Sequence, residues 1–482
     1  MEDNIGVHCY YRFFIVYTDV NTNRMDVSGL ASKLSLRYGD EALKIEPYGV
    51  EWVAPEERHG RTLGQFTLWL GSNLTIADFA LGFFPISLGL SWKWTIAALV
   101  LGNILGALAL SLCAGMGPTF GLPQMMISRR LFGSLGGRIP ALLNYLSTIG
   151  WFSVNNILGS FGLRILFPGL AFWQAAVILV VIQGLLAVFG HNLIHVYERI
   201  MSIVLGVIFL VVSVLLVRNP LLFGYHPVMH APPWAGFALV VAAALSYLGS
   251  WAPYASDYSR YLSPETKRGR VIRTSFWGGL IASLWLELVG AGVAAVSHNA
   301  SGNPIAVLHQ VSQGFGLVAV LAIILGGTAA DALNLYSNAL AAGALNIRWP
   351  RWSLAIVASL LGLGLSLWGS GSFAGYYNNF LLLLGYWITP WLGVMLADFY
   401  WVRRVLPEGT APAWSWPQIG SFVIGLVVSV PFMSSTLYTG PIATRLGGAD
   451  LTFYVGFVAS ILVYWLWVGR QSPAAIRTEP LA

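Results

Sequence analysis

The chain has 482 residues, of which 56% are hydrophobic, 13% aromatic and only 10% charged, and its formal net charge is +6. Soluble domains carry about 25% charged residues, so water cannot solvate the surface of a long chain with so few. This composition excludes a soluble multidomain enzyme and a disordered chain, and it predicts an integral membrane protein whose partner is the lipid bilayer. No basic cluster with interleaved aromatic residues is present, so the positive charge does not indicate a nucleic-acid partner.

Hydropathy predicts about twelve apolar segments, each near the roughly 20 residues that a helix needs to cross a bilayer. In chain order they cover residues 65–90, 94–115, 139–167, 172–189, 200–217, 235–255, 275–296, 315–345, 353–371, 378–401, 417–433 and 452–469. A closed β-barrel is the competing architecture, but runs such as 354–367 lack the alternation of a strand. The predicted fold class is therefore an all-α polytopic membrane protein with about 12 transmembrane helices.

The positive residues of the connecting segments are distributed unequally between the two sides of the membrane. If the N-terminus is cytoplasmic, the inner segments carry 15 Lys and Arg residues and the outer segments carry 4. Because positively charged segments stay in the cytoplasm, both termini are predicted to be cytoplasmic, with the chain in a plasma (inner) membrane.

Two of the predicted spans are interrupted by polar and small residues near their middle. The first contains the run LGSNLTIAD at 70–78, and the sixth contains YLGSWAPY at 247–254, where Pro253 lacks a backbone donor. Two broken helices five spans apart are typical of transporters built from inverted repeats, which bind substrate near the middle of the membrane. A pair of kinked packing helices is the alternative interpretation.

Several stretches of the chain carry a more specific signal. The most informative is the run GSWAPYASDYSRYL at 249–262; the others are GWFSVNN at 150–156 and the stretches 45–47, 55–58 and 329–341. Together they resemble purine–cytosine permeases of the nucleobase:cation symporter-1 family, over residues 26–470. Residues 1–24 have no counterpart, which makes Met25 a candidate start and 1–24 a candidate non-native extension.

The resemblance implies a LeuT-type 5+5 inverted repeat with broken helices 1 and 6. A cytoplasmic N-terminal segment (1–64) would precede a ten-helix transporter core (65–401), a cytoplasmic linker (402–416), two peripheral transmembrane helices (417–469) and a cytoplasmic tail (470–482). The resemblance also implies import of a nucleobase, cytosine or a purine, by alternating access in symport with H⁺ or Na⁺. No cofactor other than this coupling ion is expected.

A planar base needs an aromatic face for stacking and amide groups for its donor and acceptor edges. Trp151 and Asn155 are four residues apart, so they share one helical face and supply one of each. The adjacent Asn156 points elsewhere and is expected to bond a neighbouring helix. The resemblance adds Trp251 as a second aromatic wall, although both tryptophans also suit ordinary packing. The predicted substrate-binding set is Trp151, Asn155, Trp251, Gly249, Ser250, Asp331, Thr148 and Ser72.

Acidic residues inside the predicted spans are costly unless they are paired, hydrated or protonated, and so they indicate function. Asp78, Glu287 and Asp331 are of this kind. The sodium site of the resembled family uses two hydroxyls that align with Thr328 and Ala329, so only one of them remains here. This loss favours proton coupling through Asp331 or Asp78 over sodium coupling that includes Thr328. As a hydrogen-bond acceptor, Asp331 would also favour bases that carry an amino group.

Two further acids lie near the predicted cytoplasmic ends of spans. Asp257 stands close to Arg260 in the sequence, and Asp398 stands close to Arg403. Ion pairs at a gate or at a helix end are their expected role.

Other classes of function find less support. His191 with His195, and His226 with His230, have a spacing of four, but both pairs fall in predicted loops without the Glu of a zinc protease, so no metal site is predicted. No catalytic triad or phosphate-binding loop stands out, which disfavours a membrane enzyme, and paired broken helices favour a transporter over a channel. Hydantoin, allantoin and thiamine-type pyrimidines are the alternative substrates.

Overall fold

The structure is a computed structural model that describes residues 46–189, 191–227, 233–402 and 412–469. All of them belong to one unit, Asp40–Ala482. Every regular element among these residues is helical, in agreement with the predicted all-α class. The predictions for residues 1–45, including the start at Met25, for 403–411 of the linker and for the tail from 470 lie outside the described residues.

The first half of the chain forms, in order, η1 (Pro55–Glu57), α3 (Thr62–Asn73), α4 (Ile76–Leu81), α5 (Phe83–Ser87), α6 (Trp92–Ala114), α7 (Gly117–Phe120), α8 (Gln124–Phe132), α9 (Arg138–Leu166), α10 (Phe172–Phe189), α11 (His191–Val217), η2 (Pro220–Leu222), α12 (Pro233–Gly249), η3 (Ala252–Tyr254) and α13 (Ala255–Ser259). The second half forms α14 (Arg268–Ser297), α15 (Pro304–Val311), η4 (Gln313–Phe315), α16 (Gly316–Ala344), α17 (Arg351–Gly369), η5 (Ser370–Ser372), α18 (Phe373–Leu396), η6 (Ala397–Val402), α19 (Trp416–Ser429), η7 (Val430–Phe432), α20 (Pro441–Arg445) and α21 (Thr452–Val468).

The helices follow the predicted spans closely in most of the chain. α10 has the predicted bounds, and α9 and α16 each differ from the prediction by one residue at either end. α11 is the main exception, because it starts at His191, nine residues before the predicted span. The expectation that His191 and His195 lie in a loop is therefore wrong. Among the described residues, 6 helices are long and apolar enough to cross a membrane, and the total of twelve spans stays a prediction.

Two helices are interrupted where the polar runs lie. α3 ends at Asn73, Leu74 and Thr75 have non-helical backbone angles, and α4 starts at Ile76. α12 ends at Gly249 and is followed by the 3-10 turn η3 and then by α13. Pro253 lies inside η3 and has no N–H with which to continue α-helical hydrogen bonding.

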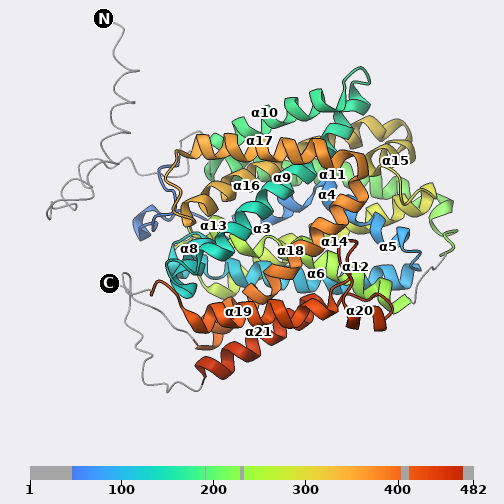
Figure 1. Cartoon of the computed structure of the whole chain (residues 1–482). Helices are drawn as coiled ribbons and strands as arrows, with labels where there is room; N and C mark the ends of the chain where they lie inside the picture. The colour runs from blue at the N-terminus through green and yellow to red at the C-terminus, as the bar shows by residue number, and fades with distance from the viewer. Residues whose placement is uncertain (1–45, 190, 228–232, 403–411, 470–482) are drawn as a thin grey trace, which may run out of the picture. The chain divides into compact units, whose positions relative to one another are not determined.

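The core helices pack as two groups. In one group α6 packs along α12, and α14 lies against α3 and α6; in the other α9 packs against α16, with α10 and α17 beside them (Figure 1). α11 contacts both α3 and α16 and so joins the groups, whereas α19 and α21 pack on each other and on α18. Helices five spans apart in the predicted order, such as α6 with α14 and α9 with α16, are in contact, which fits an inverted repeat.

The close approach of α4 to α14 depends on glycine. A Cβ atom on Gly82 would overlap the backbone of Glu287, and a Cβ atom on Gly290 would overlap the carbonyl of Phe79. The two segments therefore touch backbone to backbone, as small residues allow between membrane helices. This contact brings Glu287 of α14 close enough to Asp78 of α4 for their charges to interact.

We expect the Gly290→Ala variant to be less stable than the parent, because its Cβ meets a backbone carbonyl and the helices must separate. Overpacking of this kind costs about 1–3 kcal/mol. Thermal unfolding in detergent measures the loss. Gly206→Ala is the matched control, since nothing lies within 4 Å of a Cβ at this position in α11. Equal melting temperatures for the two variants would contradict the proposed backbone contact.

Candidate functional site

The two helix interruptions are joined by side-chain hydrogen bonds. The indole N–H of Trp251, which follows α12, donates to Asn73 Oδ1 at the end of α3 over 2.9 Å. The hydroxyl of Tyr247 lies 3.0 Å from Thr75 Oγ1, in the gap between α3 and α4. All four residues are buried. The interruptions are therefore held against each other by polar groups in the interior of the bundle.

Trp151 of α9 lies beside this junction. Its ring meets those of Tyr247 and Phe380 at centroid distances of 5.1 Å each and interplanar angles of 84° and 80°. The Trp151 side chain is 5% exposed, and its indole N–H has no hydrogen-bond partner among the described residues. A buried donor without a partner is unfavourable, so a ligand or water is needed to satisfy it.

A second polar cluster connects α9 with α16. Asn155 Nδ2 donates to Asp331 Oδ1 over 3.0 Å, and Asn334 Nδ2 donates to the same oxygen over 3.4 Å. Tyr254 of η3 reaches this cluster by donating to Asn334 Oδ1 over 3.3 Å. Asn155 Oδ1 and Asp331 Oδ2 have no partner among the described residues. The cluster therefore offers two buried acceptors beside the helix interruptions.

A cavity of about 400 Å³ lies near one side of the aromatic cluster, with Tyr377 in its lining. It is lined by residues 300–304, which follow α14, and by 370–375, which form η5 and the first residues of α18. Tyr377 also lines it; the Tyr377 hydroxyl donates to the carbonyl of Ala77 over 2.8 Å, and the ring centroid lies 6.4 Å from that of Trp151. The cavity thus lies at the C-terminal end of α14 and reaches the vicinity of the aromatic cluster.

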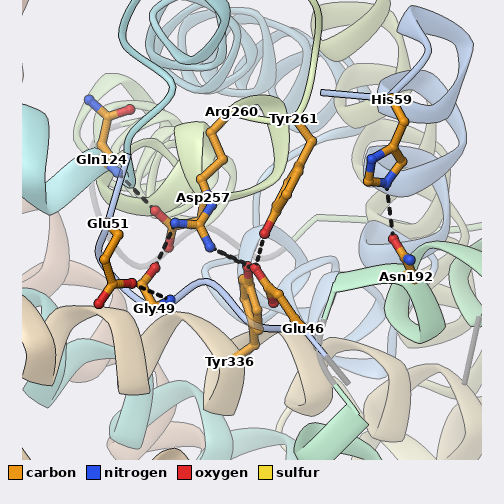
Figure 2. A network of polar contacts seen from close by, with 10 residues as sticks. All are labelled: Glu46, Gly49, Glu51, His59, Gln124, Asn192, Asp257, Arg260, Tyr261 and Tyr336. Carbon is orange, nitrogen blue, oxygen red and sulfur yellow. Dashed lines mark hydrogen bonds and ion pairs between the residues drawn. The ribbon is translucent and has the colours of Figure 1, made fainter. Parts of the chain in front are cut away.

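The opposite end of α14 is closed by a buried ion pair (Figure 2). Arg260 Nη2 lies 2.7 Å from Glu46 Oε1, and both side chains are fully buried. Tyr336 donates to the same oxygen over 2.9 Å, and Tyr261 also donates to it. Arg260 Nη1 donates to the carbonyl of Gly49 over 2.6 Å. The segment before α3 is thereby fixed to α13 and α16.

Tyr261, one of the two tyrosines that donate to Glu46, is held in its neutral form. Burial, followed by the negative charge of Glu46, raises the pKa of Tyr261 well above its ordinary value. The phenol therefore stays protonated and remains a donor at physiological pH. Asp257, which the sequence suggested as an ion-pair partner of Arg260, instead accepts the backbone N–H of Gln124 over 2.8 Å, so the carboxylate paired with Arg260 is that of Glu46.

Asp78 and Glu287 form another acidic site, between α4 and α14. Asp78 lies near the hydroxyls of Tyr247 and Ser283, but neither of its oxygens has a hydrogen bond of acceptable geometry among the described residues. Glu287 Oε2 accepts from Asn103 of α6. Two neighbouring carboxylates repel in an apolar interior, which suits this pair to holding a proton. In the described part of the chain, no three His, Cys, Asp or Glu residues come together as metal ligands.

Other residues of the predicted set use their hydroxyls locally. Four donate to backbone carbonyls within their own segment: Ser72 to Leu68, Thr148 to Asn144 and Tyr145, Ser250 to Tyr247, and Thr328 to Ile324. Thr148 also accepts from Asn338, and Gly249 is buried against α6. Substrate contacts by these residues stay predictions. Asn156 donates to the carbonyl of Ala176 in α10 over 3.1 Å, which confirms that it bonds a neighbouring helix.

Sequence reasoning missed several residues of the junction. Asn73 and Asn334 lie in the polar runs of the first and eighth predicted spans, and this position could have marked them as candidate site residues. Tyr247 and Tyr254 lie four residues before and three residues after Trp251, but nothing in the sequence distinguished them from packing tyrosines. Glu46 lies before the membrane region, and its partner is 214 residues away.

A helical bundle with two joined helix interruptions, a cavity on one side and a closed ion pair on the other defines the class of membrane transporters with a discontinuous-helix site. Residues 52–456 match the family described as permeases for cytosine/purines, uracil, thiamine and allantoin. The chain belongs to this family of permeases and is a transporter rather than an enzyme.

Individual relatives support the same assignment. The chain is 28% identical to the putative purine-cytosine permease YxlA of Bacillus subtilis over 91% of this chain and 100% of the relative. It is 26% identical to the purine-cytosine permease FCY2 of Saccharomyces cerevisiae, over 88% of this chain and 85% of the relative. The solved structure of Mhp1, a nucleobase-cation-symport-1 family transporter with bromovinylhydantoin bound, has the same fold, with a TM-score of 0.71 and 20% identity over 89% of this chain and 97% of Mhp1.

We expect a double-mutant cycle of Arg260→Met and Glu46→Gln to show strong coupling in thermal unfolding. Removing one partner of a buried ion pair costs about 3–5 kcal/mol because the other charge is left uncompensated. The double variant removes both charges and should be less destabilised than the sum of the single variants. Arg270→Met, at an exposed position early in α14, is the control. Additive effects would show that the pair does not act as a unit.

Proposed function

We propose that this permease imports a nucleobase, cytosine or a purine, across the plasma (inner) membrane by symport with a proton. We propose further that both of its termini are cytoplasmic. The relatives named above are purine-cytosine permeases, which supports the substrate class. The excess of Lys and Arg in alternate connecting segments supports the orientation.

The observation that carries the substrate proposal is a set of unsatisfied polar atoms around the helix interruptions. Within the described part of the chain, Trp151 Nε1 is a donor without a partner, and Asn155 Oδ1 and Asp331 Oδ2 are acceptors without one. An aminated base such as cytosine offers amino and ring N–H donors together with ring-nitrogen and carbonyl acceptors, so it complements this set. The aromatic rings around Trp151 would cover its face.

Proton coupling is favoured over sodium coupling by the ligands near the interruption of α3. Only Thr328 offers a hydroxyl on the relevant turn of α16, because the next residue is Ala329. Its hydroxyl hydrogen is donated to the Ile324 carbonyl over 2.8 Å. Buried carboxyls are more numerous, and Asp331 and Asp78 each retain at least one oxygen without a hydrogen-bond partner among the described residues. A carboxyl that gains and loses a proton needs no further oxygen ligands.

The cavity and the ion pair support alternating access. The 400 Å³ cavity lies beyond the C-terminal end of α14, on the proposed external side. The Glu46–Arg260 pair lies before the N-terminal end of this 30-residue helix, on the proposed cytoplasmic side. A substrate near Trp151 would be reached from outside in this arrangement, and its release would require the ion pair and its tyrosines to separate.

Uptake of labelled cytosine into proteoliposomes tests the proposed function. A pH gradient, acidic on the external side, should drive accumulation, and a sodium gradient at symmetric pH should not. Unlabelled adenine should compete for uptake. Accumulation driven by sodium alone would contradict proton coupling. If no nucleobase is carried while a hydantoin, allantoin or a thiamine-type pyrimidine is, the proposed substrate is wrong although the family assignment stands.

We expect Trp151→Ala to raise the half-saturating concentration of cytosine by about 5- to 150-fold. The estimate follows from base–aromatic stacking of about 1–3 kcal/mol. Trp173→Ala in α10 is the control, because that side chain is 58% exposed on the outside of the bundle. Concentration-dependent uptake measures both variants. Equal effects at the two positions would contradict a stacking role for Trp151.

Asp331→Asn should reduce cytosine uptake by about 5- to 150-fold and change the order in which bases compete. The substitution places an amide donor where the amino group of the base would need an acceptor, a mismatch worth about 1–3 kcal/mol. Competition by uracil should become stronger relative to competition by cytosine. An unchanged substrate ranking, together with an unchanged pH dependence of uptake, would exclude Asp331 from both recognition and coupling.

A further inference from the structure

Glu198 of α11 is a buried carboxyl that the substrate site does not use. Its side chain is 0% exposed, and neither carboxylate oxygen has a hydrogen-bond partner among the described residues. Asp331 accepts from two amides and Glu287 accepts from one. Glu198 has no such donor, although a charged carboxylate in an apolar interior is costly without one.

The carboxyl lies where α11 meets α3 and α16. A Cβ atom on Gly71, two residues before the end of α3, would overlap Glu198 Oε2 and the Glu198 carbonyl. A cavity of about 10 Å³ adjoins it, lined by Leu193, Ile194, Tyr197, Glu198, Ala329 and Ala332. This is about the space that one water needs. Glu198 is the one acidic residue in this lining, and none of the six lining residues is basic.

Few titratable groups face Glu198 from the helices packed around it. α3 and α10 carry no acidic, basic or tyrosine residue. On α16, Asp331 is directed to Asn155 and Asn334, and Tyr336 to Glu46. On α14, Glu287 is directed to Asn103 of α6, and Arg268, Arg270 and Arg273 lie in its first two turns. On α11 itself, Tyr197 interacts with the Glu198 charge while its hydroxyl donates to the Leu325 carbonyl over 3.4 Å, and His195 interacts with Arg199 and His59.

We infer that Glu198 binds and releases the proton that drives transport, at a site separate from the substrate site. This inference rests on the proposed proton symport. Sodium fits poorly, because the apolar lining supplies few oxygen ligands beyond Glu198 itself. A neutral, protonated carboxyl needs neither a cation nor several donors, and so it fits the surroundings that the structure gives it.

The position of Glu198 links its protonation to the movement of α3. It lies seven residues after the start of α11, or about 10 Å along the helix from the end next to the basic segments. Gly71 covers the carboxyl from α3, the half-helix that carries Asn73 and ends at the substrate site. If α3 separates from α11, water reaches the carboxyl, which then gives up one proton to the cytoplasmic side. The next proton must come from the external side, after α3 has closed the cytoplasmic path, so that each cycle carries one proton inwards.

The test uses Glu198→Gln in proteoliposomes, with Glu265→Gln, at an exposed position before α14, as the control. Wild type should accumulate labelled cytosine under a pH gradient, and cytosine entry should acidify a trapped pyranine solution. Glu198→Gln should still exchange internal for external cytosine, but its pH-driven accumulation and its cytosine-dependent acidification should fall at least tenfold. The control should retain all three activities.

The outcomes separate this inference from the proposed function. Wild type that neither accumulates nor exchanges cytosine would overturn the proposed substrate, and sodium-driven accumulation would overturn both proposals. Cytosine-dependent acidification that survives in Glu198→Gln would overturn the role of Glu198 alone. If Glu198→Gln does not fold, Glu198→Asp replaces it: a titrating carboxyl predicts retained acidification with a shifted pH profile. An unshifted profile would overturn the inference.

Discussion

The arrangement of this permease depends on how polar groups are satisfied where a helix stops inside an apolar bundle. Such groups find no water in a bilayer and must bond to protein or to a ligand. Here the Trp251–Asn73 and Tyr247–Thr75 hydrogen bonds satisfy some of these polar groups and join one interruption to the other. Among the described residues, the unsatisfied atoms of the proposed substrate set lie on the flanking helices α9 and α16. The proposed substrate site therefore lies beside the two interruptions.

Helix α3 connects the helix interruption with the Glu46–Arg260 ion pair. α3 ends at the proposed substrate site, begins after the segment that holds Glu46, and packs along α14 and α11. A change at the interruption therefore acts on a half-helix whose other end lies near the ion pair with Arg260. Because that pair is buried and bonded to Tyr261 and Tyr336, we expect it to separate as a unit rather than gradually. Discrete closure of this kind is what alternating access requires.

The helices could be predicted well from the sequence because lipid requires a long apolar run. Such a run is recognised in one segment without knowing which other segments pack against it. The prediction failed at the start of α11, where the polar run HNLIHVYER at 191–199 looks like a loop but is helical and packed against α3. Side-chain pairings were harder still. Asn156 was assigned correctly from helical geometry alone, whereas Arg260 was matched with its sequence neighbour Asp257. Its partner Glu46 is brought close only by the folded chain, and Glu198 fell outside the predicted span.

The buried acids differ in how many donors the fold provides, and this difference suggests a division of roles. Two amides donate to Asp331 Oδ1, and Asp331 Oδ2 accepts no hydrogen bond from the described residues. A carboxylate held in this way can accept a hydrogen bond from a ligand in one fixed orientation. Asp78 and Glu287 share a site in which one charge disfavours the other. Glu198 receives no hydrogen bond from the residues that the structure describes, and it is covered by a glycine of α3. A group with fixed donors resists changes of charge, whereas one without them changes charge whenever water gains access. Recognition and coupling can therefore be assigned to different carboxyls within one bundle, connected through the movement of α3.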